Sequence, residues 1–294
     1  MRSGFVAVLG RPNVGKSTLV NSIVGEKVSI VTDKPQTTRG RIHGVLTTEG
    51  YQMVFTDTPG FHKPRTLLGE RLNRMVEEST DEVDAVVLVV DAAAGVGRGD
   101  EYVARHRVAP LGCLKVCAVN KVDLVKGDAI LPELDAAGKL TEFDHVVPVS
   151  AKTGRGVDGL VSILAEVLPE GPAYFPPDQV TDQPVEHRIA EIVREKALAL
   201  TREEIPHSVA VQVDELTEDP DRPDLMRVVC LILVERDSQK GIVIGKGGSM
   251  LKQIGTLARE EIELLLGRRV FLELRVKVQR EWQRDPVALT RLGY

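Results

Sequence analysis

Aromatic side chains, cysteines and long apolar runs are all scarce in this 294-residue sequence. Aromatic residues make up 4% of the chain, with a single tryptophan. Three cysteines are too few, and odd in number, for a disulfide framework, and this favours a reducing compartment. The sequence contains no run of about 18 apolar residues, so no membrane-spanning helix is predicted. The first residues enter a strand pattern without the features of a signal peptide, so a cytoplasmic protein is expected.

The overall charge does not by itself indicate a nucleic-acid partner. The formal net charge is −5, which excludes a strongly basic chain. Residues 236–284 differ, because they carry 11 positive and 6 negative side chains, a net of +5. A local basic surface is the feature that a phosphate backbone requires, so this segment is the candidate for contact with nucleic acid.

Two patterns of predicted elements divide the chain. In the first part, short apolar runs alternate with helical patterns, which favours an α/β domain with a mostly parallel sheet. Its predicted strands are 5–9, 52–56, 85–90, 115–119 and 145–149, and its predicted helices include 16–24, 69–80 and 157–168. The prolines of residues 171–184 predict an extended linker. We therefore expect one domain over residues 1–170 and another over 185–294.

The second part has the order α-β-β-α-α-β, which is typical of a small α+β domain. The predicted elements are a helix at 185–201, strands at 208–216 and 226–236, a short apolar segment at 241–244, a helix at 249–266 and a strand at 270–278.

A phosphate-binding loop connects the first predicted strand to the first predicted helix. The sequence fits G-x-x-x-x-G-K-S in that context, where backbone N–H groups and a helix N-terminus bind phosphate oxygens. We expect Lys16 to reach the β- and γ-phosphates and Ser17 to ligate Mg²⁺. The predicted nucleotide contacts here are Gly10, Arg11, Pro12, Asn13, Val14, Gly15, Lys16, Ser17 and Thr18.

Two further segments complete the predicted phosphate and magnesium site. Asp57, Thr58, Pro59 and Gly60 follow the 52–56 strand, where Asp57 can hold Mg²⁺ and the Gly60 N–H can sense a γ-phosphate. Residues 36–39 form a candidate switch, in which a threonine binds Mg²⁺ only while the γ-phosphate is present. Thr38 is the predicted ligand and Thr37 the alternative.

The base is predicted to be guanine. Asp123 can accept both the N1–H and the N2–H₂ donors of guanine, and adenine lacks this pair. Asn120 is expected to tie its loop to the phosphate loop, and Lys121 to cover the ring face. Ser150, Ala151 and Lys152 follow the last predicted strand of this domain, with the Ala151 N–H aimed at guanine O6.

The sequence predicts slow hydrolysis by the isolated chain. Many GTPases place a glutamine after D-x-x-G to orient water, and Phe61 stands here instead. We therefore consider Asn13 as part of a binding site for a monovalent cation such as K⁺. Arg39 and Arg41 are further candidates for charge stabilisation, although both are expected to be solvated surface residues.

The second domain contains a G-x-x-G loop between helical segments. Such a loop lets a nucleic-acid backbone approach closely and is typical of K-homology domains. With so few aromatics, base reading is expected to depend on apolar groove contacts, and Trp282 is expected to pack inside. The predicted RNA contacts are Ile244, Gly245, Lys246, Gly247, Gly248 and Lys252.

These motifs, together with L-E-L-R-V-K-V and the C-terminal L-G-Y, resemble those of the Era family of bacterial GTPases over nearly the whole chain. The resemblance implies a Ras-like P-loop GTPase domain followed by a type II K-homology domain. It implies binding of GTP, GDP and Mg²⁺, and binding near the 3′ end of small-subunit ribosomal RNA during small ribosomal subunit maturation. It also implies a cytoplasmic protein with peripheral contact at the inner face of the membrane, and we expect a monomer.

Two alternatives belong to other classes. In one, the chain is a membrane-linked switch whose second domain binds a protein or a lipid head group through its basic segment. In the other, the second domain is only a scaffold for an ordinary GTPase.

Overall fold

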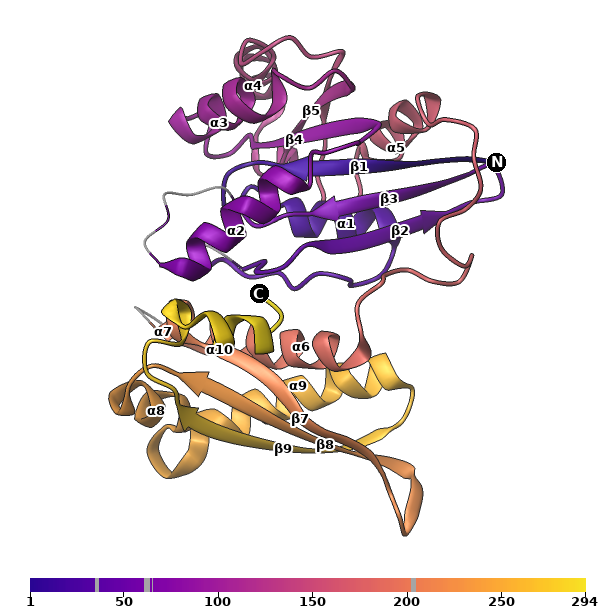
Figure 1. Cartoon of the computed structure of the whole chain (residues 1–294). Coiled ribbons are helices and arrows are strands. Elements are labelled where there is room, and N and C mark those ends of the chain that lie inside the picture. The colour runs from indigo at the N-terminus through magenta and orange to yellow at the C-terminus, as the bar shows by residue number, and fades with distance from the viewer. Residues whose placement is uncertain (35–36, 61–63, 65, 202–204) are drawn as a thin grey trace. The chain divides into compact units, whose positions relative to one another are not determined.

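The computed structural model divides into two compact units, which are described separately (Figure 1). It describes residues 1–34, 37–60, 64, 66–201 and 205–294. Unit 1 comprises Met1–Val31, Thr38–Arg65 and Gly69–Asp182. Unit 2 comprises Thr32–Thr37, Thr66–Leu68 and Gln183–Tyr294. Within the described residues, no helix combines the length and apolar character needed to cross a membrane.

The sheet of unit 1 has the order β2-β3-β1-β4-β5-β6, and all neighbours are parallel except β2 and β3. The strands are β1 (Arg2–Leu9), β2 (Ile42–Thr47), β3 (Tyr51–Asp57), β4 (Ala85–Asp91), β5 (Leu114–Asn120) and β6 (His145–Pro148). The helices are α1 (Lys16–Val24), α2 (Leu67–Glu78), α3 (Arg98–Val103), α4 (Ile130–Gly138) and α5 (Val157–Glu166). A π-helical turn, Ala104–Val108, continues α3, and 3₁₀ turns occur at Val122–Leu124 and Gly127–Ala129.

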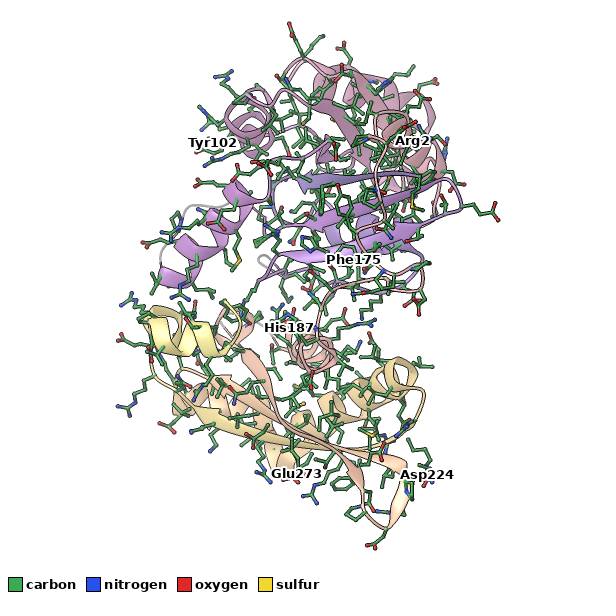
Figure 2. The ribbon with its side chains drawn as sticks, turned by 45° about the vertical axis from the view of Figure 1, so that its right-hand side comes forward. Arg2, Tyr102, Phe175, His187, Asp224 and Glu273 are labelled. Carbon is green, nitrogen blue, oxygen red and sulfur yellow. The ribbon has the colours of Figure 1, made fainter. Side chains whose placement is uncertain are left out.

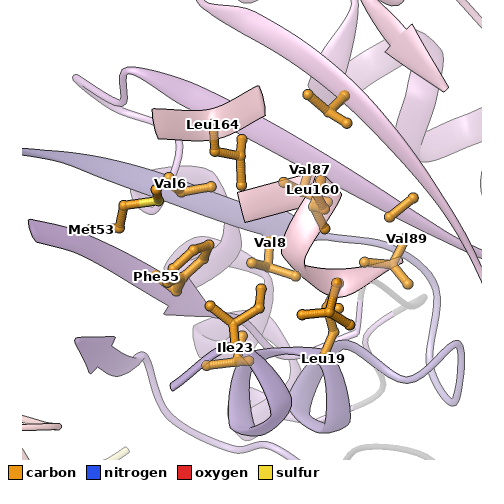
Figure 3. Packing of buried hydrophobic residues seen from close by; sticks show 14 of the residues in the cluster. Val6, Val8, Leu19, Ile23, Met53, Phe55, Val87, Val89, Leu160 and Leu164 are labelled. Atoms are coloured by element: carbon orange, nitrogen blue, oxygen red, sulfur yellow. The ribbon is translucent and has the colours of Figure 1, made fainter. Parts of the chain in front are cut away.

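Helices cover both faces of this sheet, as its continuous apolar strands require. Every residue of β4 is buried. On one face, Leu19 and Ile23 of α1 and Leu160 and Leu164 of α5 pack against Phe55 and its strand neighbours (Figure 3). On the other face, residues of α2, α3 and α4 form a second cluster with the outward side chains of β4 and β5. The carboxyl ends of the parallel strands are thereby fixed along one edge.

All five strands predicted for this domain are present, and the mostly parallel sheet is confirmed. Strand β2 was not predicted. It pairs antiparallel with β3 as a hairpin, in register Val45 to Val54. The turn between them, Thr48-Glu49-Gly50, was the available signal, because a short loop with glycine between alternating runs is typical of a hairpin.

The proline-rich connector lies against the sheet of unit 1. Gln52 of β3 is fully buried, and its amide binds residues about 120 positions away. Its Nε2 donates to the Phe175 carbonyl at 2.9 Å, and its Oε1 accepts from the N–H groups of Tyr174 (2.7 Å) and Phe175 (3.0 Å). The Val45 N–H also donates to the Val180 carbonyl at 2.8 Å. The connector is therefore held at the β2–β3 edge, beside which Figure 2 labels Phe175.

Unit 2 is a three-stranded sheet of order β7-β8-β9 with helices on one face. Strands β7 and β8 are antiparallel, and β8 and β9 are parallel. The strands are β7 (Ala210–Asp219), β8 (Arg222–Val234) and β9 (Arg269–Val278). The helices are α6 (Val185–Leu200), α7 (Ile205–Ser208), α8 (Asp237–Ile244), α9 (Ser249–Leu266) and α10 (Pro286–Arg291), with 3₁₀ turns Lys246–Gly248 and Trp282–Arg284.

The predicted order of this second unit is confirmed, and α9 has the predicted bounds. Apolar side chains of α6 and α9 pack on the inner face of β8, where Val228, Cys230 and Ile232 are fully buried. Trp282 is also fully buried, as expected, and its indole N–H donates to the Ser208 carbonyl at 2.9 Å. The short helices α7 and α10 were not predicted.

Candidate nucleotide and nucleic-acid sites

Residues 10–17 form a loop that leaves the carboxyl end of β1 and enters α1. Lys16 begins the helix with its side chain folded back over the loop. Its ammonium group donates to the carbonyls of Gly10 and Arg11, each at 3.0 Å. Burial lowers the pKa of Lys16 to about 8, while Asp57 and Asp100 act in the opposite direction. The loop thus holds a buried cation at the N-terminus of a helix, which is an arrangement suited to phosphate.

The three predicted magnesium ligands lie together beside this loop. The Ser17 and Thr38 hydroxyl oxygens are 2.9 Å apart, and the Thr38 hydroxyl donates to Asp57 Oδ2 at 3.3 Å. Burial raises the pKa of Asp57, whereas Ser17, Lys16 and Thr38 oppose the shift. Thr37 does not join the cluster, since its hydroxyl donates to the Lys34 carbonyl at 2.7 Å. The structure therefore favours Thr38 over Thr37.

This cluster fits a magnesium ion. Asp57 is fully buried, and its Oδ1 has no hydrogen-bond partner among the described residues. A buried carboxylate oxygen without a partner is costly unless a ligand completes it. Two hydroxyl oxygens and a carboxylate are hard oxygen donors of the kind that Mg²⁺ prefers, and Mg²⁺ retains several of its waters in such sites.

The residues after Asp57 contact the phosphate loop from the side. The Thr58 hydroxyl donates to the Val8 carbonyl at 2.9 Å, which anchors the end of β3 to β1. A Cβ added to Gly60 would lie 2.8 Å from the Pro12 Cα and N atoms, so only glycine allows this approach. Pro59 is also buried. Phe61, which occupies the position of the glutamine found in many GTPases, lies outside the described residues.

The predicted base motif is tied to the phosphate loop as expected. Asn120, at the end of β5, donates from Nδ2 to the Val14 carbonyl at 2.9 Å. Its Oδ1 accepts from the Ala151 N–H at 2.9 Å, so the donor predicted for guanine O6 is engaged by Asn120 in this structure. The same amide therefore joins three segments, namely the phosphate loop, the end of β5 and the loop after β6.

Lys121 and Asp123 complete this side of the site. Lys121 has a left-handed backbone (φ 66°), and its ammonium donates to the Asn13 carbonyl (2.7 Å) and to Asp91 Oδ2 (2.6 Å). Asp123 is exposed, and its Oδ1 accepts from the Ser150 hydroxyl at 2.6 Å. This hydrogen bond orients the carboxylate that is expected to receive the two guanine donors. Lys152 is exposed in the turn that follows.

One expectation about this region is wrong. Arg39 was expected on the solvated surface, but its side chain is only 2% exposed, whereas Arg41 is exposed. Arg39 directly follows Thr38, whose hydroxyl lies in the buried cluster with Ser17 and Asp57, so its side chain is buried as well. The chain returns to the surface at Arg41, before β2 begins.

Unit 2 contains a groove of about 530 Å³ between α9 and β9. Two predicted RNA contacts, Gly248 and Lys252, line it, and the other four lie in α8 and in the turn that leads into α9. The groove is lined by Gly248, Leu251, Lys252, Gly255, Thr256, Arg259, Val270, Phe271, Leu272, Glu273 and Leu274. Its lining is thus partly apolar, and Lys252 and Arg259 supply positive charge.

Among the lining residues that were not predicted, three carry a charge or an aromatic ring: Arg259, Phe271 and Glu273. Phe271 is 52% exposed, so the groove offers an aromatic face for stacking in addition to its apolar floor. Glu273, labelled in Figure 2, adds a carboxylate from β9, and its Oε1 accepts from Arg275 Nε at 2.8 Å. The alternation along β9 was the available signal, because Phe271 and Glu273 are two residues apart and so share a face of the strand.

Two family models match the two units. The model described as a 50S ribosome-binding GTPase matches residues 5–121, and the model described as a KH domain matches residues 204–283. The GTPase Era of Mycolicibacterium smegmatis is 48% identical over 100% of this chain and 99% of its own length. The GTPase Era of Mycobacterium tuberculosis is 48% identical over 99% of this chain and 98% of its own.

Solved structures give the same relationship. A crystal structure of Era in complex with MgGDPNP and nucleotides 1506–1542 of 16S ribosomal RNA superposes with a TM-score of 0.97 at 41% identity, covering 100% of this chain and 99% of that one. An Aquifex aeolicus Era variant bound to GDP·AlF4⁻ gives a TM-score of 0.96 at 41% identity, with the same coverage. The sequence relationship extends over the whole chain and over both units, so the chain belongs to the Era family of GTPases.

Proposed function

We propose that this protein binds GTP with Mg²⁺, hydrolyses it to GDP and phosphate, and binds small-subunit ribosomal RNA near its 3′ end to assist small ribosomal subunit maturation. The cluster of Ser17, Thr38 and Asp57 beside a complete phosphate loop carries the nucleotide part of this proposal. The MgGDPNP and 16S ribosomal RNA bound by the related Era structure support both parts.

Each residue of the nucleotide site has a task that follows from its chemistry. Lys16 neutralises the β- and γ-phosphates, and the backbone N–H groups of residues 10–17 other than Pro12 orient them. Ser17, Thr38 and Asp57 hold the Mg²⁺, which when bound neutralises charge on the phosphates. Asp123 and Asn120 select guanine by accepting its donors and by fixing the loop. The Gly60 N–H is expected to respond to the γ-phosphate, as its place after Asp57 predicts.

Hydrolysis by the chain alone is expected to be slow, and we propose that a monovalent cation assists it. Asn13 is exposed at the rim of the phosphate loop, with a left-handed backbone (φ 66°). Its side-chain oxygen is a suitable ligand for K⁺ beside the phosphates, where a positive charge stabilises the transition state. GTP hydrolysis would then be faster in K⁺ than in Na⁺, and equal rates would refute this role of Asn13.

The groove of unit 2 is the proposed RNA site. Three of the four residues of the turn at 245–248 are glycines, so a nearly bare backbone borders the groove at Gly248, where Lys252 and Arg259 would contact phosphates. We propose residues 1–170 as the GTPase domain, 171–184 as the connector and 185–294 as the RNA-binding domain. The protein would act as a monomer in the cytoplasm, where small ribosomal subunits mature, with at most peripheral membrane contact.

The test combines hydrolysis with RNA capture. Phosphate release from GTP and from ATP is measured with Mg²⁺, and the full chain should hydrolyse only GTP. In Ser17→Ala the rate with GTP should fall at least about tenfold, because an ion ligand is lost. RNA crosslinked in cells should then be enriched at one site near the 3′ end of small-subunit ribosomal RNA. RNA recovered from many scattered sites would favour the membrane-linked alternative. Binding to anionic vesicles that persists in a variant with both Gly247→Asp and Gly248→Asp would favour it as well.

A further inference from the structure

Arg11, in the second position of the phosphate loop, makes its side-chain contacts with another part of unit 1. Its Nε lies 3.1 Å from Asp100 Oδ1 and 2.9 Å from Oδ2, and its Nη2 donates to the Gly95 carbonyl at 3.1 Å. Asp100 lies in α3, and Gly95 lies in the loop between β4 and α3. The guanidinium is thus bound by a carboxylate and a carbonyl, and neither belongs to the phosphate loop.

The burial and hydrogen bonds of Asp100 favour this contact. Its side chain is fully buried, whereas that of Arg11 is 29% exposed. Its Oδ2 also accepts from the Gly97 N–H at 3.0 Å, so the carboxylate helps to cap the N-terminus of α3. A Cβ placed on Gly99 would lie 3.6 Å from Arg11 Cβ and Cδ, which shows that the arginine stem packs on this helix. A buried carboxylate of this kind requires its partner, because an unpaired buried charge is strongly unfavourable.

The end of β4 is linked to the phosphate loop at a second point, through Lys121. Asp91, at the end of β4, accepts from the Lys121 ammonium, which also donates to the Asn13 carbonyl. Asp91 Oδ1 accepts from the N–H groups of Ala93 and Ala94 at 2.9 and 3.1 Å, so this carboxylate also shapes its own loop. Residues 11 and 13 of the phosphate loop are therefore both held from the β4–α3 side.

This arrangement bears on phosphate binding because it fixes the backbone that Lys16 touches. The Arg11 carbonyl is one of the two acceptors for the Lys16 ammonium. Asn13 adopts a left-handed conformation that is unfavourable for a residue with a side chain. External contacts on both sides of Pro12 keep the loop in this conformation before any nucleotide arrives, and this reduces the ordering cost of binding.

We propose that Asp100 is a positioning residue for the nucleotide site: by binding Arg11 it holds the phosphate loop in the conformation that receives the phosphates. This inference rests on the proposed nucleotide binding and deepens it. Arg11 then serves the site through its backbone and through Asp100, and its guanidinium is committed to that carboxylate and does not bind a phosphate oxygen.

A double-mutant cycle on the full chain tests the proposal, with the dissociation constant of fluorescently labelled GDP in Mg²⁺ as the readout. Asp100→Ala and Arg11→Ala should each weaken GDP about tenfold, as expected when one charge-assisted contact is lost. The double variant should also lose about tenfold and not about a hundredfold, because both changes remove the same contact. Asp100→Asn keeps the shape and one acceptor oxygen, so its loss should be smaller.

Two measurements separate positioning from a general loss of folding. A variant that is merely unstable lowers the fraction of protein that binds and leaves the dissociation constant of the folded fraction unchanged. The proposal predicts a changed dissociation constant at full binding stoichiometry, with the preference for GDP over ADP retained. Arg98→Ala is the matched control, since it removes an exposed arginine from the same helix and should leave GDP affinity unchanged.

The outcomes are distinct. Wild-type GDP affinity in Asp100→Ala, or losses that multiply in the double variant, would overturn the inference while leaving the proposed function in place. Tighter GDP binding by Asp100→Ala would also overturn it, since this would mean that the carboxylate withholds Arg11 from the phosphates. A wild-type chain that binds no GDP would overturn the proposed function and the inference with it.

Discussion

Replacing Gln52 with alanine should release the connector from the sheet of unit 1. The change removes an amide that binds three backbone groups of residues 174–175, and these groups would be left without their partner. A buried polar group without a partner costs about 1–3 kcal/mol. Tyr174 is 51% exposed, so water can reach these groups and the lower end of that range applies to each. The expected loss in the free energy of unfolding of unit 1 is therefore about 3 kcal/mol.

Two assays measure this effect in the full chain. Urea unfolding followed by far-ultraviolet circular dichroism should show the transition of unit 1 moved to lower urea, with the transition of unit 2 unchanged. Limited proteolysis should then cut within residues 171–184 in Gln52→Ala and spare them in the wild type, because an unpinned, proline-rich chain becomes accessible.

Thr47→Val is the matched control for Gln52→Ala. It removes only the acceptor of the other Nε2 hydrogen bond, at 2.9 Å, and should cost about 1 kcal/mol without exposing the connector. The reasoning would be refuted if Gln52→Ala cost less than about 1 kcal/mol. Equal protection of the connector in the wild type and in Gln52→Ala would refute it as well.

Three further predictions concern other parts of the chain. Asn120→Asp removes the donor to the phosphate loop and should weaken labelled GDP at least about tenfold; unchanged affinity would contradict the tie. Gly247→Asp should lower affinity for an RNA oligonucleotide and lower the melting temperature only slightly, because its φ of 60° is strained for a side chain but a Cβ there meets nothing within 4 Å. At Gly245 a Cβ would lie 2.7 Å from the Met250 Cβ of α9, so Gly245→Asp should destabilise the domain more strongly. Burial raises the pKa of Cys117 and Cys230 to about 12, so neither thiol should react with a thiol reagent at about pH 8 until the protein is unfolded, and reaction of both in the native protein would contradict their burial.

The nucleotide site could be predicted from the sequence because its motifs are local. Residues 10–17 occupy one strand-to-helix turn, and Asp57 and Asn120 each end a strand that has a clear apolar pattern. Parallel strands bring their carboxyl ends to one edge, so the relative position of these residues follows from the topology. Once the topology has placed their segments at this edge, the side chains of Lys16 and Thr38 can contact their partners directly.

Contacts between distant segments could not be predicted in this way. Gln52 reads as an ordinary polar residue of a strand, and only the fold places residues 174–175 beside it. The pairing of Arg11 with Asp100 spans 89 positions and depends on how α3 leaves β4. Arg39 is buried next to Thr38 of the magnesium cluster, and no apolar pattern around it indicates this. In each case a polar side chain takes its role from a tertiary contact that local periodicity does not encode.

The burial of Trp282 gives the chain an intrinsic fluorescence signal for the folding of unit 2. It is the only tryptophan of the sequence, and its ring centre lies 6.2 Å from that of Tyr294 inside unit 2. Tryptophan emission from the intact protein therefore arises from unit 2 alone. Melting of unit 1 leaves this signal unchanged unless the disturbance reaches unit 2, so comparing emission with circular dichroism measures, without any label, whether the two units lose their order together or in turn.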